Sequence, residues 1–210
     1  EWGRFLKRHD FLVGISIDGP RELHDRHRRD KGDHGTFDRV MRGIEALRSR
    51  RVEFNLMCCV HRQNADHPLE IYDFFRTLGT GHWQFITIVE PDPSAAEGVT
   101  PETVRPEQYA RFMTKVFDRW VRHDVGKVFV QLIETAFRVH AGHNAGLCMF
   151  EETCGHAMAL EHNGDLYSCD HFVTPDHFLG NIHELGEQDL ASLPRQRKFG
   201  RMKRDGLPRA

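Results

Sequence analysis

Three apolar runs of strand length alternate with amphipathic segments in the first half of the chain. The runs cover residues 11–17, 52–60 and 83–89. Between them, apolar residues recur at helical spacing over residues 37–50 and again after His67-Pro68. Apolar strands separated by helices are typical of a parallel sheet that is covered on at least one face and joined by right-handed crossovers. We therefore predict an α/β fold with the order strand, helix, strand, helix, strand.

A capping residue and further amphipathic segments indicate where the remaining helices and loops lie. Thr36 is placed to cap the helix over residues 37–50, and the polar stretch 21–33 before it predicts a loop. A strong amphipathic pattern predicts a helix over residues 106–123, and residues 128–139 predict a strand that turns into a helix.

The character of the sequence changes near residue 142. From there glycines, histidines and cysteines dominate and the helical periodicity fades. Asn163-Gly164 lies between two short apolar segments, which is the strongest local signal for a hairpin. We predict two parts, residues 1–141 and 142–210.

Composition and charge narrow the possible partners. The chain has 29 basic and 31 acidic residues, a net charge of −2 and a mean hydropathy of −0.56. These values indicate no broad positive electrostatic field that would attract nucleic acid or an anionic membrane. No run of residues is apolar enough to span a bilayer. Without a signal-peptide pattern we expect a cytoplasmic protein. We also expect it to be a monomer. Because the chain starts at Glu1 within a few residues of a strand pattern, we expect an internal fragment.

Polar side chains lie at the carboxyl ends of the predicted strands. Ligands of parallel sheets bind at that edge, so Ser16, Asp18, Gln84 and Glu90 are candidate binding residues. The alternative for each one is an ordinary polar residue that caps a turn.

The cysteines indicate a second kind of chemistry. Cys148, Cys154 and Cys169 have the spacings C-x5-C and C-x14-C, and the last pair brackets the predicted hairpin. Thiols in such a loop-rich segment suit an iron-sulfur cluster or zinc, although they could also be small buried residues. Cys58 and Cys59 are expected to be core residues. A fourth ligand could come from a histidine: His156, His162 or His171.

Asp170 directly follows Cys169 and is a candidate general base. Burial and a neighbouring anionic cluster would both raise its pKa and help it to accept a proton near neutral pH. The alternative is an ordinary turn aspartate.

Several short motifs are distributed along nearly the whole chain. They are Gly14-Ile15-Ser16-Ile17-Asp18-Gly19-Pro20, His24-Asp25 with Arg28, Gly35-Thr36-Phe37-Asp38, Val52-Glu53-Phe54-Asn55, Gln84-Phe85-Ile86, Asn163-Gly164-Asp165-Leu166-Tyr167-Ser168-Cys169-Asp170 and Leu179-Gly180-Asn181-Ile182. Together they resemble the anaerobic sulfatase-maturating enzymes, which are radical S-adenosylmethionine proteins with a C-terminal SPASM domain.

The resemblance implies a fold, a reaction and roles for particular residues. The fold would be the C-terminal part of a partial (β/α)6 barrel followed by an incomplete SPASM domain. The reaction would be oxidation of a Cys or Ser in an unfolded sulfatase segment to Cα-formylglycine, with S-adenosylmethionine and 4Fe-4S clusters as cofactors. By similarity, Cys148, Cys154 and Cys169 would bind an auxiliary cluster, and Asp170 would deprotonate the substrate. Two residues, Ser16 and Arg28, would hold S-adenosylmethionine, with Asp18 a further candidate.

Two other functions are compatible with the same residues. One is a different SPASM maturase that acts on ribosomally made peptides. The other is a non-catalytic module whose cysteines hold zinc or nothing. Iron, sulfide and zinc analysis after anaerobic purification separates this module from the two enzymes.

We predict that this polypeptide alone does not cleave S-adenosylmethionine, because its sequence contains no C-x3-C-x2-C motif for the cleaving cluster. The protein is reconstituted with iron and sulfide, reduced, and assayed for 5′-deoxyadenosine beside a complete maturase. Formation of 5′-deoxyadenosine by the chain would contradict the prediction.

Overall fold

The computed structural model describes residues 1–185 and 190–206. The chain forms two compact units, Glu1–Glu134 and Thr135–Ala210, and each is described separately below. The division falls within helix α6 (Gln131–His140), before the boundary that the sequence predicts near residue 142.

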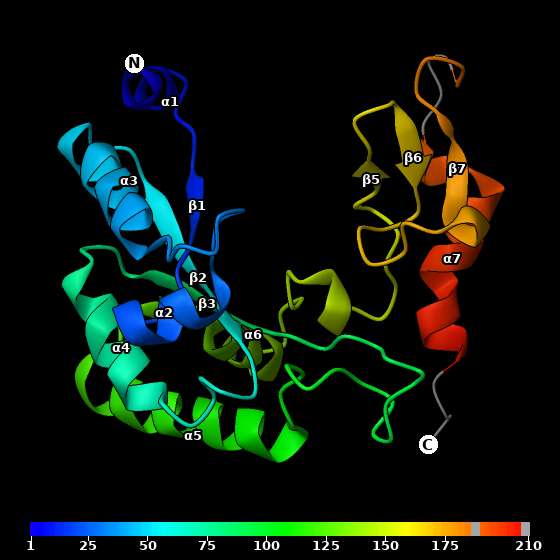
Figure 1. Cartoon of the computed structure of the whole chain (residues 1–210). Helices are drawn as coiled ribbons and strands as arrows, with labels where there is room; N and C mark the ends of the chain where they lie inside the picture. Colours follow the sequence, from blue (N-terminus) through cyan, green and yellow to red (C-terminus); the bar gives the residue numbers. More distant parts are fainter. Residues whose placement is uncertain (186–189, 207–210) are drawn as a thin grey trace. The chain divides into compact units, whose positions relative to one another are not determined.

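A parallel sheet forms the centre of the first unit (Figure 1). Its strands lie in the order β1 (Val13–Ser16), β2 (Phe54–Val60), β3 (His82–Thr87) and β4 (Phe129–Val130), and each pairs in parallel with the next. The helices are α1 (Trp2–Arg8), α2 (Arg21–His27), α3 (Phe37–Ser49), α4 (Pro68–Thr77), α5 (Pro106–His123) and α6. The predicted alternation of strands and helices in a parallel α/β fold is confirmed.

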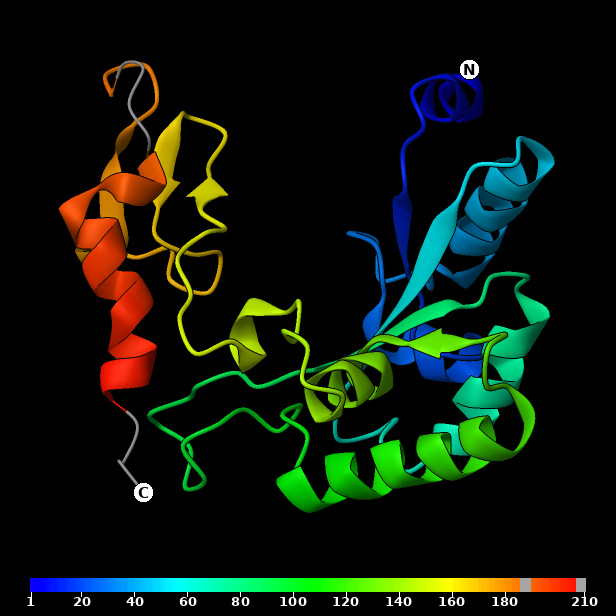
Figure 2. The ribbon, with the colours of Figure 1, turned by 180° about the vertical axis from the view of Figure 1, so that it is seen from behind.

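One face of this sheet is covered and the other is open. Along β2, the even-numbered side chains from Phe54 to Val60 are buried, while Asn55, Met57 and Cys59 are half-buried. Helices α3, α4 and α5 lie on the covered side in both views (Figures 1 and 2). The core between them contains Ile44, Leu56, Ile71, Tyr72, Phe75, Trp83, Phe112, Val116 and Trp120. Cys58 belongs to this core as predicted, but Cys59 lies on the open face, so the prediction of a core position for Cys59 is wrong.

Residues 21–27 form a helix, α2, where the sequence predicts a polar loop. The helix is too short and polar to be stable by itself, but Leu23 and His24 are buried against the rest of the unit. Arg21 also pairs with Asp38 of α3, and its guanidinium lies 4.9 Å from the ring centroid of Phe37. Tertiary contacts therefore decide this element.

Helix α3 begins at Phe37 as predicted, but its cap is not the Thr36 side chain. The Asp25 carboxylate of α2 accepts the Phe37 N–H at 2.9 Å, and the Thr36 hydroxyl donates instead to the Arg28 carbonyl at 2.8 Å. A carboxylate from another segment thus satisfies the free N–H at the start of the helix.

The second unit contains a small antiparallel sheet. Strands β5 (Ala159–Leu160), β6 (Asp165–Tyr167) and β7 (Phe178–Asn181) pair in that order, which confirms the predicted hairpin. Gly164 has a φ of +90° in the connecting turn, a conformation that glycine adopts at little cost. The described part of this unit also has the short 3₁₀ helices η1 (Cys148–Phe150), η2 (Pro175–His177) and η3 (Leu190–Ser192), and helix α7 (Pro194–Asp205). Within the described residues, every helix is too short or too polar to cross a bilayer.

We predict that Tyr72→Phe lowers the free energy of unfolding by about 1–3 kcal/mol. The buried Tyr72 hydroxyl donates to the Asp124 carboxylate at 2.7 Å, and that carboxylate is itself buried. Urea denaturation measures the loss. Tyr109→Phe is the control, because the Tyr109 hydroxyl donates to a neutral carbonyl, that of Phe85, at 3.0 Å. An equal or larger loss for Tyr109→Phe would contradict the prediction.

Candidate functional site

The open face of the sheet presents a row of polar positions in the first unit. Ser16 pairs in register with Met57, and Met57 with Gln84, so all three side chains project from the same face. Ser16 is exposed and Gln84 half-buried. The structure therefore brings two of the candidate residues into one row.

Asp18 lies just beyond β1 and is almost fully buried, with 2% of its surface exposed. Its carboxylate accepts hydrogen bonds from Arg28 Nε at 2.6 Å and Nη2 at 3.0 Å, and from the Cys59 backbone N–H at 2.9 Å. Both oxygens of the carboxylate are therefore hydrogen-bonded within the protein, and Asp18 connects the segment after α2 to the end of β2.

Arg28 is held at this edge but remains reachable. Its side chain is 28% exposed, and Nη2 also donates to Cys59 Sγ at 3.3 Å. Burial is the largest single influence and lowers the pKa of Arg28, but the hydrogen bond and the charge of Asp18, with smaller contributions from Cys59 and Cys58, together raise it above its ordinary value. The side chain is therefore a fixed cation beside the open face.

His24 completes the connection between Asp18 and Arg28. Its Nδ1 accepts the Asp18 backbone N–H at 3.3 Å, and its Nε2 lies 3.1 Å from Thr36 Oγ1, which bonds the Arg28 carbonyl. These partners fit a neutral ring protonated on Nε2. Burial lowers the pKa of His24, which favours the same neutral form.

His61 is a buried histidine that sequence analysis missed. It follows β2 and is 1% exposed, with Nδ1 accepting the Gln63 backbone N–H at 3.3 Å. Within the described residues, Nε2 has no hydrogen-bond partner. Burial, and then the charge of His27 whose ring centroid lies 4.1 Å away, lowers the pKa of His61 to about 4. No sequence signal distinguishes it, because histidine is common in this chain.

Glu90, the remaining strand-end candidate, is exposed and belongs to the loop after β3. Its carboxylate lies 3.4 Å from the Thr100 hydroxyl, and its backbone N–H donates to Thr103 Oγ1 at 3.0 Å. Both contacts join Glu90 to other residues of the same loop, so they stabilise the conformation of the loop.

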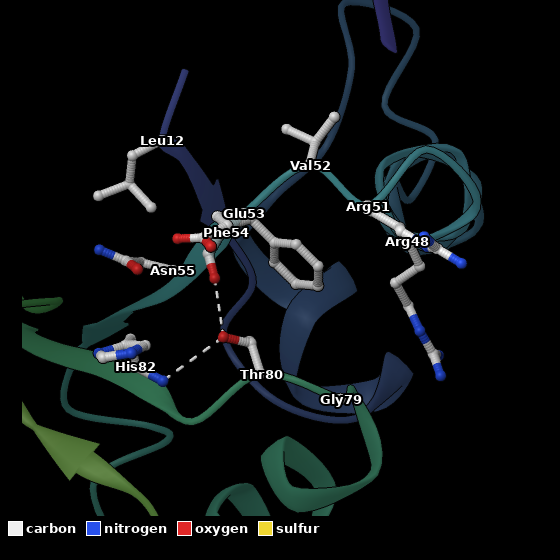
Figure 3. A pocket seen from close by; sticks show the side chains of 10 residues that line it. All are labelled: Leu12, Arg48, Arg51, Val52, Glu53, Phe54, Asn55, Gly79, Thr80 and His82. Carbon is white, nitrogen blue, oxygen red and sulfur yellow. Dashed lines mark hydrogen bonds between the residues drawn. The ribbon is translucent and has the colours of Figure 1, made fainter. Parts of the chain in front are cut away.

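A pocket of about 470 Å³ lies at the opposite end of the strands (Figure 3). It is formed where β2 and β3 begin, and the Thr80 hydroxyl donates to the Phe54 carbonyl there at 2.8 Å. Its lining residues are Leu12, Arg48, Arg51, Val52, Glu53, Phe54, Asn55, Gly79, Thr80 and His82. Since parallel sheets bind ligands at the carboxyl ends of their strands, this pocket is not the candidate site.

The three candidate cysteines of the second unit carry free thiols. Cys148 is exposed on η1, while Cys154 and Cys169 are half-buried on either side of the hairpin. Burial raises the pKa of Cys169, and its hydrogen bond to the Asp170 carboxylate acts in the same direction. Across residues 1–185 and 190–206, no three His, Cys, Asp or Glu side chains form a ready metal-binding group, and this applies also to His156, His162 and His171.

The environment of Asp170 differs from the prediction. The residue is exposed, and its carboxylate accepts a hydrogen bond from the Cys169 thiol at 3.2 Å. That bond lowers the pKa of Asp170, whereas the sequence predicts a pKa raised by burial. The burial expected for Asp170 is therefore wrong, because its carboxylate faces water and accepts a hydrogen bond, while the effect of a neighbouring cluster on its pKa stays a prediction.

Comparison with curated proteins finds relatives over almost the full chain. A serine-type anaerobic sulfatase-maturating enzyme of Bacteroides thetaiotaomicron is 39% identical over 99% of this chain and 53% of its own length. A serine-type enzyme of Klebsiella aerogenes is 34% identical over 96% of the chain and 49% of its length. A cysteine-type enzyme of Clostridium novyi is 31% identical over 90% of this chain and 51% of its own length. The chain thus spans about half the length of these relatives.

Solved structures give the same result. Native anSMEcpe with bound AdoMet matches with a TM-score of 0.87 and 28% identity, over 97% of this chain and 56% of that protein. The same protein with AdoMet and the Cp18Cys peptide also matches with a TM-score of 0.87, at 29% identity and the same coverage. No family model matches the chain.

We predict that the thermal stability of the first unit falls as the pH is lowered from about 6.5 to about 4, and that His61→Asn removes part of this fall. The unfolded chain binds a proton at His61 near the ordinary pKa, whereas the folded chain binds it only near pH 4. Acidification through this window therefore favours unfolding. Melting curves across the window measure the effect, and His82→Asn, at an exposed histidine, is the control. Identical profiles for His61→Asn and the unchanged protein would refute the prediction.

Proposed function

Since the chain belongs to the same family as the anaerobic sulfatase-maturating enzymes, about half of whose length it spans, we propose that it takes part in sulfatase maturation. The reaction is oxidation of a Cys or Ser side chain in an unfolded sulfatase segment to Cα-formylglycine. The observation that carries this proposal is the 39% identity to a serine-type maturase over 99% of the chain, which includes both units. Relatives of both the serine and the cysteine type leave the substrate residue open.

In this proposal the open face of the first unit holds S-adenosylmethionine. When bound and reductively cleaved, this cofactor supplies the radical that takes a hydrogen from Cβ of the substrate residue. Arg28 offers a fixed cation for the carboxylate of the methionine part. Asp18 and Cys59 take the bonds of its Nε and Nη2, so Nη1 is the nitrogen that can donate to that carboxylate. The exposed Ser16 hydroxyl offers a second donor on the same face. The bonds of Asp18 point to an indirect role, in which it fixes Arg28.

The second unit supplies thiolates and a carboxylate. Cys148, Cys154 and Cys169 have the donor chemistry of iron-sulfur ligands, since all three are free thiols. Asp170 is proposed as the base that accepts the proton of the substrate thiol or hydroxyl. Its carboxylate is exposed directly beside Cys169, where a substrate side chain can reach it.

The proposal is tested in a chimera in which this chain replaces the matching segment of the Bacteroides thetaiotaomicron relative. We expect the reconstituted chimera to form the aldehyde of formylglycine in a sulfatase-derived peptide with Cys or Ser at the target position, as measured by mass spectrometry. A folded chimera that cleaves S-adenosylmethionine but leaves both peptides unchanged would refute the proposed function.

A variant of the chimera tests the role of Asp170. Asp170→Asn should lower formylglycine formation by about 10²–10⁴-fold, the usual contribution of a general base. Asp176→Asn is the matched control, because Asp176 is also an exposed carboxylate in a turn of the same unit. Equal losses for the two variants would exclude the proposed role of Asp170.

A further inference from the structure

Gln84 is a candidate residue on the open face of the first unit that the proposed function leaves unused. We propose that its carboxamide binds the main chain of the polypeptide substrate, by pairing with the N–H and the C=O of one residue near the target Cys or Ser. The inference rests on the proposed function, because it takes a polypeptide as the substrate of this face. It adds a substrate-binding residue to the cofactor contacts of Ser16 and Arg28.

Gln84 lies near the middle of β3, beside the strands proposed to hold the cofactor. It pairs in register with Met57, and Met57 pairs with Ser16, so the three residues form one row across β1, β2 and β3. Neighbouring strands are about 4.8 Å apart, which places Gln84 roughly 10 Å from Ser16 along this row. A cofactor bound to Ser16 and Arg28 lies over β1 and the end of β2, so β3 is the adjacent strand on which a second molecule can lie.

The neighbours of Gln84 on this face turn away from it. A Cβ atom at Gly14 would lie 2.8 Å from the Met57 sulfur, so the Met57 side chain lies over β1. The His82 ring stacks on the Phe129 ring of β4, with the ring centroids 5.0 Å apart and an interplanar angle of 12°. Gln84 stands between these two side chains, and neither of them covers its carboxamide.

The carboxamide of Gln84 is partly enclosed but unpaired. The residue is half-buried, and among residues 1–185 and 190–206 no group forms a hydrogen bond with its side chain. A carboxamide has N–H donors and an acceptor oxygen, so a ligand that satisfies it supplies both an acceptor and a donor. Partial burial makes an unpaired amide unfavourable, and a ligand that pairs with it removes this penalty.

A main chain in extended conformation meets this requirement. The N–H and C=O of one residue in a strand point to the same side, as in the antiparallel pairs that exchange both bonds. The Gln84 oxygen can accept that N–H while its nitrogen donates to that C=O. Such bonds do not depend on the side chain of the bound residue, so they suit a Cys and a Ser substrate equally.

Binding of a fluorescent sulfatase-derived peptide to the chimera, with S-adenosylmethionine present and without reduction, tests the inference. We expect Gln84→Ala to weaken peptide affinity by about 5- to 30-fold, the effect of one or two lost neutral hydrogen bonds. The affinity for S-adenosylmethionine should stay unchanged. Because glutamine can also pair with an adenine ring, a loss of cofactor affinity in Gln84→Ala would overturn the inference.

Asn55→Ala is the matched control for this experiment. Asn55 is also half-buried on the open face, and its carboxamide has no hydrogen-bond partner in the described part of the chain. It pairs with Gly14, one row nearer the amino ends of the strands, where parallel sheets do not bind ligands. Equal losses for the two variants would contradict the proposed role of Gln84. Circular dichroism checks folding, and Gln84→Met, which keeps the size of the side chain, decides the result if Gln84→Ala does not fold.

A series of peptides with a single N-methylated residue identifies the bond itself. N-methylation removes one main-chain N–H, so we expect one peptide of the series to bind more weakly to the unchanged chimera and to show no such loss with Gln84→Ala. Losses that are the same in both proteins at every position would refute a main-chain bond while the proposed function stands. A chimera that binds none of the peptides would refute the inference and the proposed function together.

Discussion

The buried carboxylate of Asp18 is the constraint on which the candidate site of the first unit depends. A buried charge is costly unless it is paired and hydrogen-bonded, and Asp18 meets this requirement with the Arg28 guanidinium and the Cys59 N–H. The same bonds fix where Arg28 stands, because its side chain must reach the end of β2 to complete the pair. A buried carboxylate can thus determine the position of the cation that is proposed to bind the cofactor.

His24 and Thr36 extend this constraint along the chain. They connect the Asp18 backbone to the Arg28 carbonyl, so both ends of the Arg28 residue are anchored. The short helix α2 exists within this network, and its polar sequence becomes helical because Leu23 and His24 are buried. The fold of residues 18–36 is therefore a consequence of satisfying one buried charge and two buried side chains.

The second unit uses backbone bonds for a comparable purpose. Its sheet is small and its loops are long, so little apolar burial is available to fix the cysteine segments. Helix α7 supplies donors and a close backbone approach instead, through Gln196, Gly200 and Lys203. The two units thus share a principle, since in each of them polar groups that need partners hold the residues proposed to carry the chemistry.

The sequence alone determined the elements with strong periodicity. The parallel strands, helices α3, α4 and α5, and the Asn163-Gly164 hairpin follow from local pattern, because each requires only the spacing of apolar residues or a turn with positive φ. The candidate cysteines and Ser16, Asp18 and Arg28 also follow from motifs. Only the tertiary structure decided which polar groups pair. It shows that Asp25 and not Thr36 caps α3, and that Asp18 forms an ion pair with Arg28. It also shows that His61 is buried and that α7 forms hydrogen bonds with all three cysteine segments. These pairings join residues distant in sequence, and local pattern carries no information about which distant groups will satisfy one another's hydrogen bonds and charges.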